Sequence, residues 1–218
     1  MTLSEENYLK AIYHLSKETP KSVTTNALAR VLKTKASSVT DMIKRLAQKQ
    51  WVVYKPYQGV ELSEQGQKSA LKVIRKHRLW EVFLVEKLNF SWDEVHEVAE
   101  QLEHIQSDKL VEQLDIFLQF PDTDPHGDPI PDKNGNMPIR KKLLLNDLRV
   151  GEQGYCIGVK NTSSEFLQYL DRIDISIGKL IKVVHYETFD NSIHIITENK
   201  EKNISALIAK NIFVKKDV

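Results

Sequence analysis

The first third of the chain combines three apolar stripes at helical spacing with two short extended runs. We predict helices over residues 4–17, 26–32 and 37–50, where apolar side chains recur every three to four positions. Apolar runs at 51–55 and 59–62 surround the turn-forming sequence PYQG and predict a β-hairpin. Two short helices joined by a tight turn and followed by a hairpin are typical of a winged helix-turn-helix.

The outward side of the predicted third helix carries small polar side chains and cations. Such side chains read base edges or hold phosphates when a recognition helix enters the major groove of DNA. The tip of the hairpin adds one further lysine. The candidate DNA-binding residues are Lys35, Ser37, Ser38, Thr40, Asp41, Lys44, Arg45 and Lys55. The alternative is an ordinary three-helix core with a solvated outer face.

The middle of the chain is predicted to be helical and to end in a loop. A long helix begins at Ser63 and continues to about Leu88, and a further helix covers Val95–Leu110. The next helix begins at Ser107 or Asp108 and carries a strong apolar stripe. Together with the apolar side chains of the long helix, this stripe makes more apolar surface than one small domain covers, which predicts a dimer interface. Residues 121–140 contain five of the seven prolines and are predicted to form a linker.

From residue 143 the pattern changes to short apolar runs separated by Gly and Asn turns, with one helix near 163–173. This pattern predicts a small β-barrel of about 70 residues. The predicted fold class is therefore mainly α with a small β domain. Its parts are a winged helix-turn-helix at 1–74, a helical domain at 75–140 and the β-barrel at 141–218.

Charge is distributed unevenly along the chain although the formal net charge is only +1. Residues 1–75 hold 13 Lys/Arg against 6 Asp/Glu, a net charge of +7, whereas residues 76–140 hold 6 against 14, a net charge of −8. A basic N-terminal third predicts a polyanionic partner, and an acidic middle predicts a bound cation.

Composition favours a globular cytoplasmic protein. The hydrophobic fraction of 41% and the charged fraction of 28% are ordinary for a globular domain. No apolar run approaches the roughly 20 residues that span a bilayer, so no membrane partner is expected. The single Cys156 excludes an internal disulfide and fits a reducing compartment. Its setting, GYCIGV, is typical of a buried strand, which argues against a nucleophile.

Metal-competent side chains gather in the acidic middle. If Val95–Leu110 is one helix, then His96, Glu100, Glu103 and His104 share an arc of roughly 100°. His77 and Glu81 are spaced i, i+4 on the preceding helix, and two facing helices of this kind make a cation site. The alternative is a solvated helix face. For Asp124 and His126, a second metal position and exposed loop residues are about equally plausible.

Five segments resemble the iron- and manganese-dependent repressor family, named for the diphtheria toxin repressor. They are EENYLKAIY, SSVTDMIKRL, RKHRLWEVFL, VHEVAEQLEHIQSD and FPDTDPHGDPIP. The resemblance covers essentially the whole chain and is greatest to the manganese-responsive members with three domains. It implies a helical domain for metal binding and dimerisation and a C-terminal SH3-like barrel.

The resemblance also implies two metal positions. Carried over residue by residue, the first uses His77, Glu100, Glu103, His104 and Asn7, with Glu81 and His96 as ancillary ligands. The second uses Asp124 and His126, with Asn161 where the family has a carboxylate. The sequence departs from the family at Asn7, where relatives carry Asp or Met, and at Asn161. Glu100 replaces the Cys of iron-responsive members, and a set of oxygen and imidazole ligands suits Mn(II), with Fe(II) as the alternative.

The function that follows is a metal-dependent, DNA-binding transcriptional repressor of metal-uptake genes, acting as a homodimer on double-stranded operator DNA. Metal binding is expected to set the orientation of the two recognition helices. One alternative is a winged-helix regulator that responds to an organic ligand. An enzyme is not expected, because the sequence His96-Glu97-x-x-Glu100 lacks the second His of a metalloprotease motif.

Overall fold

The computed structural model describes residues 1–18, 22–56, 58–138 and 142–217. Its internal contacts divide the chain into two units, which are described separately. The first consists of Met1–His77, Glu100–Val111 and Pro131–Pro138, and the second of Arg78–Ala99, Glu112–Ile130 and Ile139–Val218. Three helices, α4 (Glu64–Leu88), α5 (Val95–Leu102) and α6 (Asp108–Phe117), contribute residues to both units.

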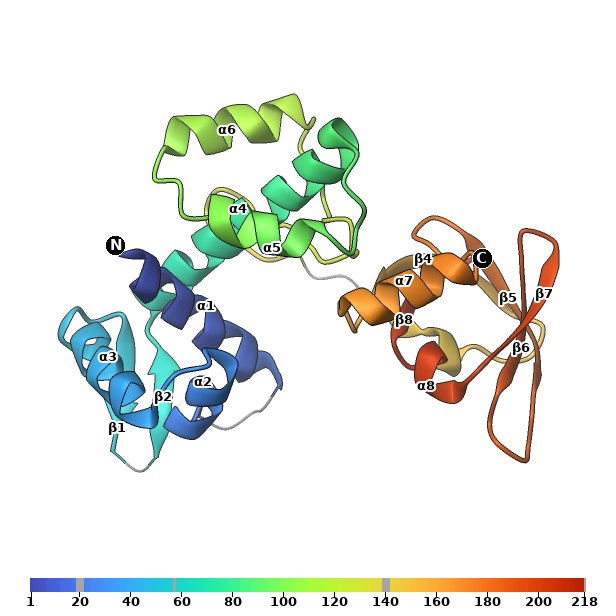
Figure 1. Cartoon of the computed structure of the whole chain (residues 1–218), viewed down its shortest axis with the longest axis horizontal. Helices are drawn as coiled ribbons and strands as arrows, with labels where there is room; N and C mark the ends of the chain where they lie inside the picture. Colours follow the sequence, from blue (N-terminus) through green and yellow to red (C-terminus); the bar gives the residue numbers. More distant parts are fainter. Residues whose placement is uncertain (19–21, 57, 139–141, 218) are drawn as a thin grey trace. The chain divides into compact units, whose positions relative to one another are not determined.

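The first unit contains the predicted winged helix-turn-helix (Figure 1). It begins with α1 (Leu3–Glu18), α2 (Thr25–Val31) and α3 (Ala36–Gln48), followed by β1 (Val52–Lys55) and β2 (Gly59–Leu62). The two strands pair antiparallel from Val52↔Leu62 to Lys55↔Gly59. Gly59 has φ of +110°, and a Cβ there would lie 2.7 Å from the carbonyl oxygen of Val23, so the hairpin requires a glycine.

Local hydrogen bonds explain where two of these helices begin. The Thr24 side chain accepts a hydrogen bond from the backbone N–H of Ala27 and caps α2. The Ser63 hydroxyl accepts from the N–H of Gly66 and donates to the carbonyl of Gln50, which ties the start of α4 to the end of the turn after α3.

One buried apolar cluster holds this part together, and α1 contributes a large share of it. The largest fully buried side chains from the three helices are Leu9, Ile12, Leu28, Ile43 and Leu46. The same face of α1 adds Tyr8, Ala11 and Tyr13 to the cluster. Helices α1 and α3 therefore contribute to one shared core.

The expectation of a single helix over Val95–Leu110 is wrong, because α5 ends at Leu102. Glu103 and His104 lie in the turn that follows, and α6 starts only at Asp108. Tertiary contacts explain the break, since both side chains bind groups on α1, as described below.

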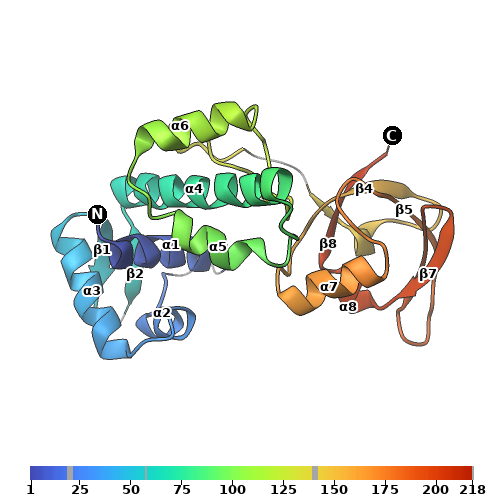
Figure 2. The same ribbon diagram turned by 45° about the horizontal axis from the view of Figure 1, so that its top comes forward.

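The second unit includes a six-stranded antiparallel sheet in the order β3-β8-β4-β5-β6-β7. Figure 2 shows β4, β5, β7 and β8 of this sheet together with α7 and α8. The strands are β3 (Leu143–Leu144), β4 (Gln153–Val159), β5 (Leu180–Tyr186), β6 (Ile193–Thr197), β7 (Lys200–Ile204) and β8 (Ile212–Lys216). Helices α7 (Ser164–Arg172) and α8 (Ala206–Ala209) pack Leu167, Leu170 and Ala209 into its core. Strand β7 was not predicted, because its polar sequence KEKNI lacks a clear alternation. The four-residue helix α8 was not predicted either.

The described part of the Pro-rich segment is an ordered loop that contacts β4. The side chain of Asp124 accepts from the backbone N–H groups of His126 and Asp128. Gly127 has φ of +84°, and a Cβ there would lie 2.0 Å from the carbonyl oxygen of Ile157, so the loop approaches the strand closely. No helix among the described residues has the length and apolarity that crossing a bilayer requires.

Candidate metal centre

Three side chains of the first unit bring ligand atoms together. His77 comes from α4, Glu100 from α5 and Glu103 from the turn after α5, and one donor atom of each lies within 4.8 Å of the others. The Nδ1 atom of His77 is 2.6 Å from Oε2 of Glu103. All three residues were predicted as ligands, and the structure places them in one cluster.

The ammonium group of Lys10 lies inside this cluster. Its Nζ is 2.5 Å from Oε1 of Glu100, 2.6 Å from Oε2 of Glu103 and 3.2 Å from Nδ1 of His77. The Lys10 side chain is 12% exposed and that of Glu103 is fully buried, so the pair is shielded from solvent. Ion pairs in such surroundings are stronger than exposed ones, because the local dielectric constant is low.

A second contact, between Glu6 and His104, connects α1 to the turn after α5. Oε2 of Glu6 is 2.6 Å from Nδ1 of His104, and Oε1 accepts a hydrogen bond of 2.9 Å from Gln106. Lys76 contributes an ammonium 3.7 Å from Oε1 of Glu6. His104, a predicted ligand, thus lies next to the cluster and 3.7 Å from Oε1 of Glu103.

Two buried oxygen atoms of predicted ligands lack a hydrogen-bond partner among the described residues: Oε1 of Glu103, in this cluster, and Oδ1 of Asn7, on α1. Leaving a buried acceptor unsatisfied costs about 1–3 kcal/mol. Both atoms belong to residues predicted as ligands, and both are hard oxygen donors. A divalent cation bound in the cluster would satisfy Oε1 of Glu103, so the residues present fit a metal such as Mn(II).

The second unit contains another group of ligand atoms, from Glu81, Asp124 and His126, which lie within 4.8 Å of one another and are buried. Nδ1 of His126 is 3.8 Å from Oε1 of Glu81, and its Nε2 is 2.7 Å from the carbonyl oxygen of Trp92. Donation from Nε2 to this carbonyl leaves Nδ1 as the ring atom that faces the carboxylates.

Burial and charge alter both loop residues of this group. Burial, together with the charges of Glu81 and Asp128, raises the pKa of Asp124 to about 6. Burial alone would lower the pKa of His126, but hydrogen bonding to Glu81 and the charges of Glu81 and Asp124 outweigh it and raise that pKa to about 9. The protonated His126 side chain therefore supplies a positive charge next to these carboxylates. A metal ion bound at Nδ1 would take the place of its proton.

Two other predicted ligands lie outside these groups of buried donors. His96 is largely exposed, with Nδ1 at 3.6 Å from Oε1 of Glu81. Asn161 is exposed, and its Oδ1 accepts from the backbone N–H of Ser163. Its role here is to fix the loop before α7.

The predicted DNA-binding residues lie on α3 or at the hairpin, and almost all are exposed. These are Lys35, Ser37, Ser38, Asp41, Lys44, Arg45 and Lys55. Thr40 is half-buried, and its hydroxyl donates to the carbonyl of Ala36 one turn earlier, which leaves it less suited to a base contact.

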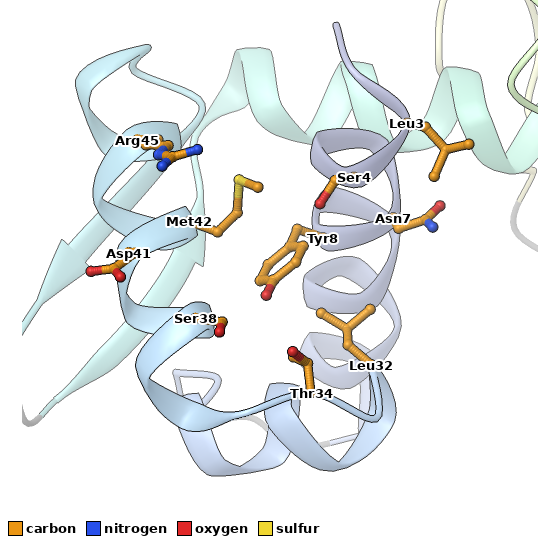
Figure 3. Close-up of a pocket in the computed structure, with 10 residues that line it drawn as sticks. All are labelled: Leu3, Ser4, Asn7, Tyr8, Leu32, Thr34, Ser38, Asp41, Met42 and Arg45. Carbon is orange, nitrogen blue, oxygen red and sulfur yellow. The ribbon is translucent and has the colours of Figure 1, made fainter.

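A cavity of about 490 Å³ separates α1 from α3 (Figure 3). Tyr8 of α1 projects into it, and Ser38, Asp41 and Arg45 of α3 line the opposite side. Asn7 borders the cavity but points away from Met42.

Sequence reasoning missed two residues, Lys10 and Glu6. Both lie in the EENYLKAIY segment, but a lysine or glutamate in a first helix ordinarily indicates a solvated face. Their partners Glu100 and His104 lie 90 and 98 residues further along the chain. The i, i+4 spacing of Glu6 and Lys10 was the one signal that they share a helix face.

Three family models match successive parts of the chain. The iron dependent repressor N-terminal DNA binding domain matches residues 1–60, and the iron dependent repressor metal binding and dimerisation domain matches residues 63–132. The FeoA domain matches residues 143–216. The predicted fold class, mainly α with a small C-terminal β domain, is confirmed.

Curated relatives match somewhat more than half of the chain. An uncharacterized HTH-type transcriptional regulator of Methanocaldococcus jannaschii, MJ0568, is 40% identical over 119 residues, which are 55% of this chain and 95% of that protein. The iron-dependent repressor IdeR of Mycobacterium tuberculosis is 34% identical over 128 residues, which are 58% of this chain and 54% of IdeR. The chain thus matches about half the length of that repressor.

Solved structures match along nearly the whole length. A manganese-dependent transcriptional repressor in complex with manganese has a TM-score of 0.84 at 32% identity, covering 97% of this chain and 99% of that chain. ScaR with bound Zn²⁺ has a TM-score of 0.76 at 33% identity, covering 98% of this chain and 99% of that chain.

Proposed function

This chain belongs to the family of iron- and manganese-dependent transcriptional repressors, and we propose that it represses metal-uptake genes in response to Mn(II). It is a metal-responsive DNA-binding repressor with a domain for metal binding and dimerisation, and its family consists of repressors rather than enzymes. The proposal extends to the identity of the metal, the ligand residues and the regulated genes.

One observation carries the assignment of the metal site. The donor atoms of His77, Glu100 and Glu103 lie together, and the remaining oxygen of Glu103 is buried without a hydrogen-bond partner among the described residues. We assign these three residues, together with His104 and the Oδ1 atom of Asn7, as the ligands of the first metal. A bound Mn(II) supplies a divalent positive charge that compensates the clustered carboxylates.

The chemistry of the ligands supports Mn(II). Carboxylate, amide and imidazole groups are hard or borderline ligands, and a thiolate is missing from the set. Later transition metals bind most such sets more tightly, so selection for Mn(II) depends on geometry and on the supply of each metal in the cell. Fe(II) has similar preferences and is the second candidate, in keeping with iron-dependent relatives such as IdeR.

Helix α1 links the site to DNA binding. One side carries Glu6 and Lys10, which contact His104 and Glu100, and another buries Leu9 and Ile12 in the core to which α3 contributes. Ligation of an ion by Asn7, and by His104 as the partner of Glu6, would shift α1, and α3 would follow because it contributes to the same core. Coupling of two sites in this way is worth about 1–3 kcal/mol.

A second metal position is proposed at Glu81, Asp124 and His126. The loop holding the last two is fixed by hydrogen bonds of the Asp124 carboxylate, so the ligands are preorganised. His96, next to Glu81, is proposed as an ancillary ligand. Ligation by His126 requires loss of its proton, so binding at this position releases a proton and strengthens as pH rises toward about 9.

The direct test is fluorescence anisotropy with labelled promoter DNA of a manganese-uptake gene. Titration in excess Mn(II) should give a much lower Kd than titration in EDTA, and a scrambled duplex serves as the control. Parallel titrations with Fe(II) under anaerobic conditions and with Zn(II) rank the metals. Equal operator binding in Mn(II) and in EDTA would disprove metal activation and would favour a regulator that responds to an organic ligand.

A further inference from the structure

We infer that Lys10 competes with the metal for the first site, as a cation that the protein itself supplies. The inference rests on the proposed function, because it concerns the affinity of that same site. It assigns a role to a residue that is neither a ligand nor a DNA contact.

The distances make the two occupants mutually exclusive. Nζ of Lys10 is 2.5 Å from Glu100, 2.6 Å from Glu103 and 3.2 Å from His77. Oxygen and imidazole ligands hold divalent ions at about 2.0–2.6 Å. An ion bonded to these same atoms would therefore overlap the ammonium group, and the lysine must leave before the ion can enter.

Charge explains why a lysine stabilises this position. The Glu103 carboxylate is fully buried and that of Glu100 is about one-third exposed, so the pair would repel each other without a nearby cation. One ammonium compensates one of the two negative charges, whereas a divalent ion compensates both. The lysine thus supports the folded cluster at low metal concentration and weakens metal binding by the free energy of its own ion pairs.

This competition sets a threshold in the metal concentration at which the site becomes loaded. A metal sensor must remain unloaded at ordinary metal concentration, and a high-affinity set of carboxylates would otherwise load too early. A tethered cation raises the metal concentration needed for half-loading without removing any ligand. Lys10 lies on α1, so its departure also releases one link between α1 and the end of α5 as the metal forms another.

Two variants test the inference by metal binding rather than by repression. Lys10→Met keeps the length of the side chain and removes the charge, and Lys10→Gln serves if the Met variant does not fold. We expect Mn(II) to bind either variant about tenfold or more tightly than wild type, measured by the loss of the free Mn(II) signal in electron paramagnetic resonance. In EDTA the variants should melt at a lower temperature than wild type, and excess Mn(II) should remove that difference.

Lys76→Met is the matched control. The Lys76 side chain is also 12% exposed and lies near a buried carboxylate, but its contact is with Glu6 at 3.7 Å. Loss of this charge should change the Mn(II) affinity far less than loss of Lys10 does. An equal gain in both variants would indicate a general effect of charge and would overturn the inference.

Amine labelling of the wild-type protein measures independently whether Mn(II) makes the Lys10 ammonium group accessible. Acetylation by an N-hydroxysuccinimide ester, followed by mass spectrometry, should modify Lys10 several-fold faster in Mn(II) than in EDTA, while Lys76 remains slow. If Mn(II) binds but neither the labelling of Lys10 nor the affinity of Lys10→Met changes, the competition is disproved. If neither wild type nor Lys10→Met binds Mn(II), the proposed metal site itself is wrong.

Discussion

Replacing Glu103 by Gln removes one negative charge from the metal centre and leaves the shape of the side chain nearly unchanged. Oε2 of Glu103 lies 2.6 Å from Nζ of Lys10 and 2.6 Å from Nδ1 of His77, and Oε1 is the buried oxygen that lacks a hydrogen-bond partner among the described residues. A glutamine offers one neutral oxygen and an NH₂ group that repels cations. The variant should therefore lose metal binding while it retains its fold.

Linkage gives the size of the effect. A ligand at 100 times its Kd stabilises the folded protein by about 2.7 kcal/mol. For a chain of this length about 1 kcal/mol corresponds to roughly 2–4 °C, so wild type should gain about 5–10 °C in that excess of Mn(II). Glu103→Gln should gain almost nothing. In EDTA it should be less stable than wild type by about 1–3 kcal/mol, because Lys10 loses one of its two carboxylate partners.

The assay is thermal unfolding followed by circular dichroism, in EDTA and in excess Mn(II), with the operator-binding experiment in parallel. Glu97→Gln is the control, since Glu97 is an exposed carboxylate on α5, the helix that precedes Glu103. This variant should respond to Mn(II) as wild type does. A full Mn(II) shift in Glu103→Gln would remove Glu103 from the ligand set, and loss of its far-ultraviolet spectrum would show a structural role instead.

Three further predictions concern other parts of the chain. Arg45 lies on the exposed face of α3, and Arg45→Ala should weaken operator binding in Mn(II) roughly tenfold. The slope of log Kd against log salt concentration should fall by about one, and an unchanged slope would exclude a phosphate contact. Phe117 is 58% exposed at the end of α6, so Phe117→Ser should weaken the dimer by about 1.5–3 kcal/mol per copy in sedimentation equilibrium, and an unchanged dimer would place the interface elsewhere. Burial raises the pKa of the Cys156 thiol to about 11, so DTNB should react slowly with the native protein and rapidly in guanidinium, and fast native reaction would contradict this burial.

Segments with a strong period were predictable from the sequence. The helices of the N-terminal region and the hairpin follow from apolar spacing and from the glycine at its tip, and α4 was predicted to within one residue at its start. The proposed ligands His77 and Glu100 could be selected from the sequence because their spacing and their family resemblance agree. Each of these features is encoded in a short segment of the chain, either by its spacing of apolar residues or by a motif shared with relatives.

Features that depend on distant contacts were not predictable. The sequence signals the start of α6 at Ser107 or Asp108, but it does not signal the end of α5 at Leu102, since the chain continues with Glu103 and His104 and lacks Gly or Pro there. The helix ends because Lys10 and Glu6, from the first helix, bind these two side chains. A local pattern cannot report an ion pair that closes a loop of about 90 residues, because the energy of that pair appears only in the folded chain.

The two groups of ligands each contain a basic side chain, and the difference between those side chains predicts how each group responds to metal. In the first, the Lys10 ammonium contacts the donor atoms of His77, Glu100 and Glu103. In the second, Nε of Arg78 lies 3.3 Å from Asp124, but the same guanidinium also donates to the carbonyl of Pro129 at 2.5 Å. A flexible ammonium can move to solvent without breaking the backbone, whereas the guanidinium also holds the loop that presents the ligands. Metal entry should therefore displace the lysine and leave the arginine in place, so that the first group acts as the switch and the second as a preformed site.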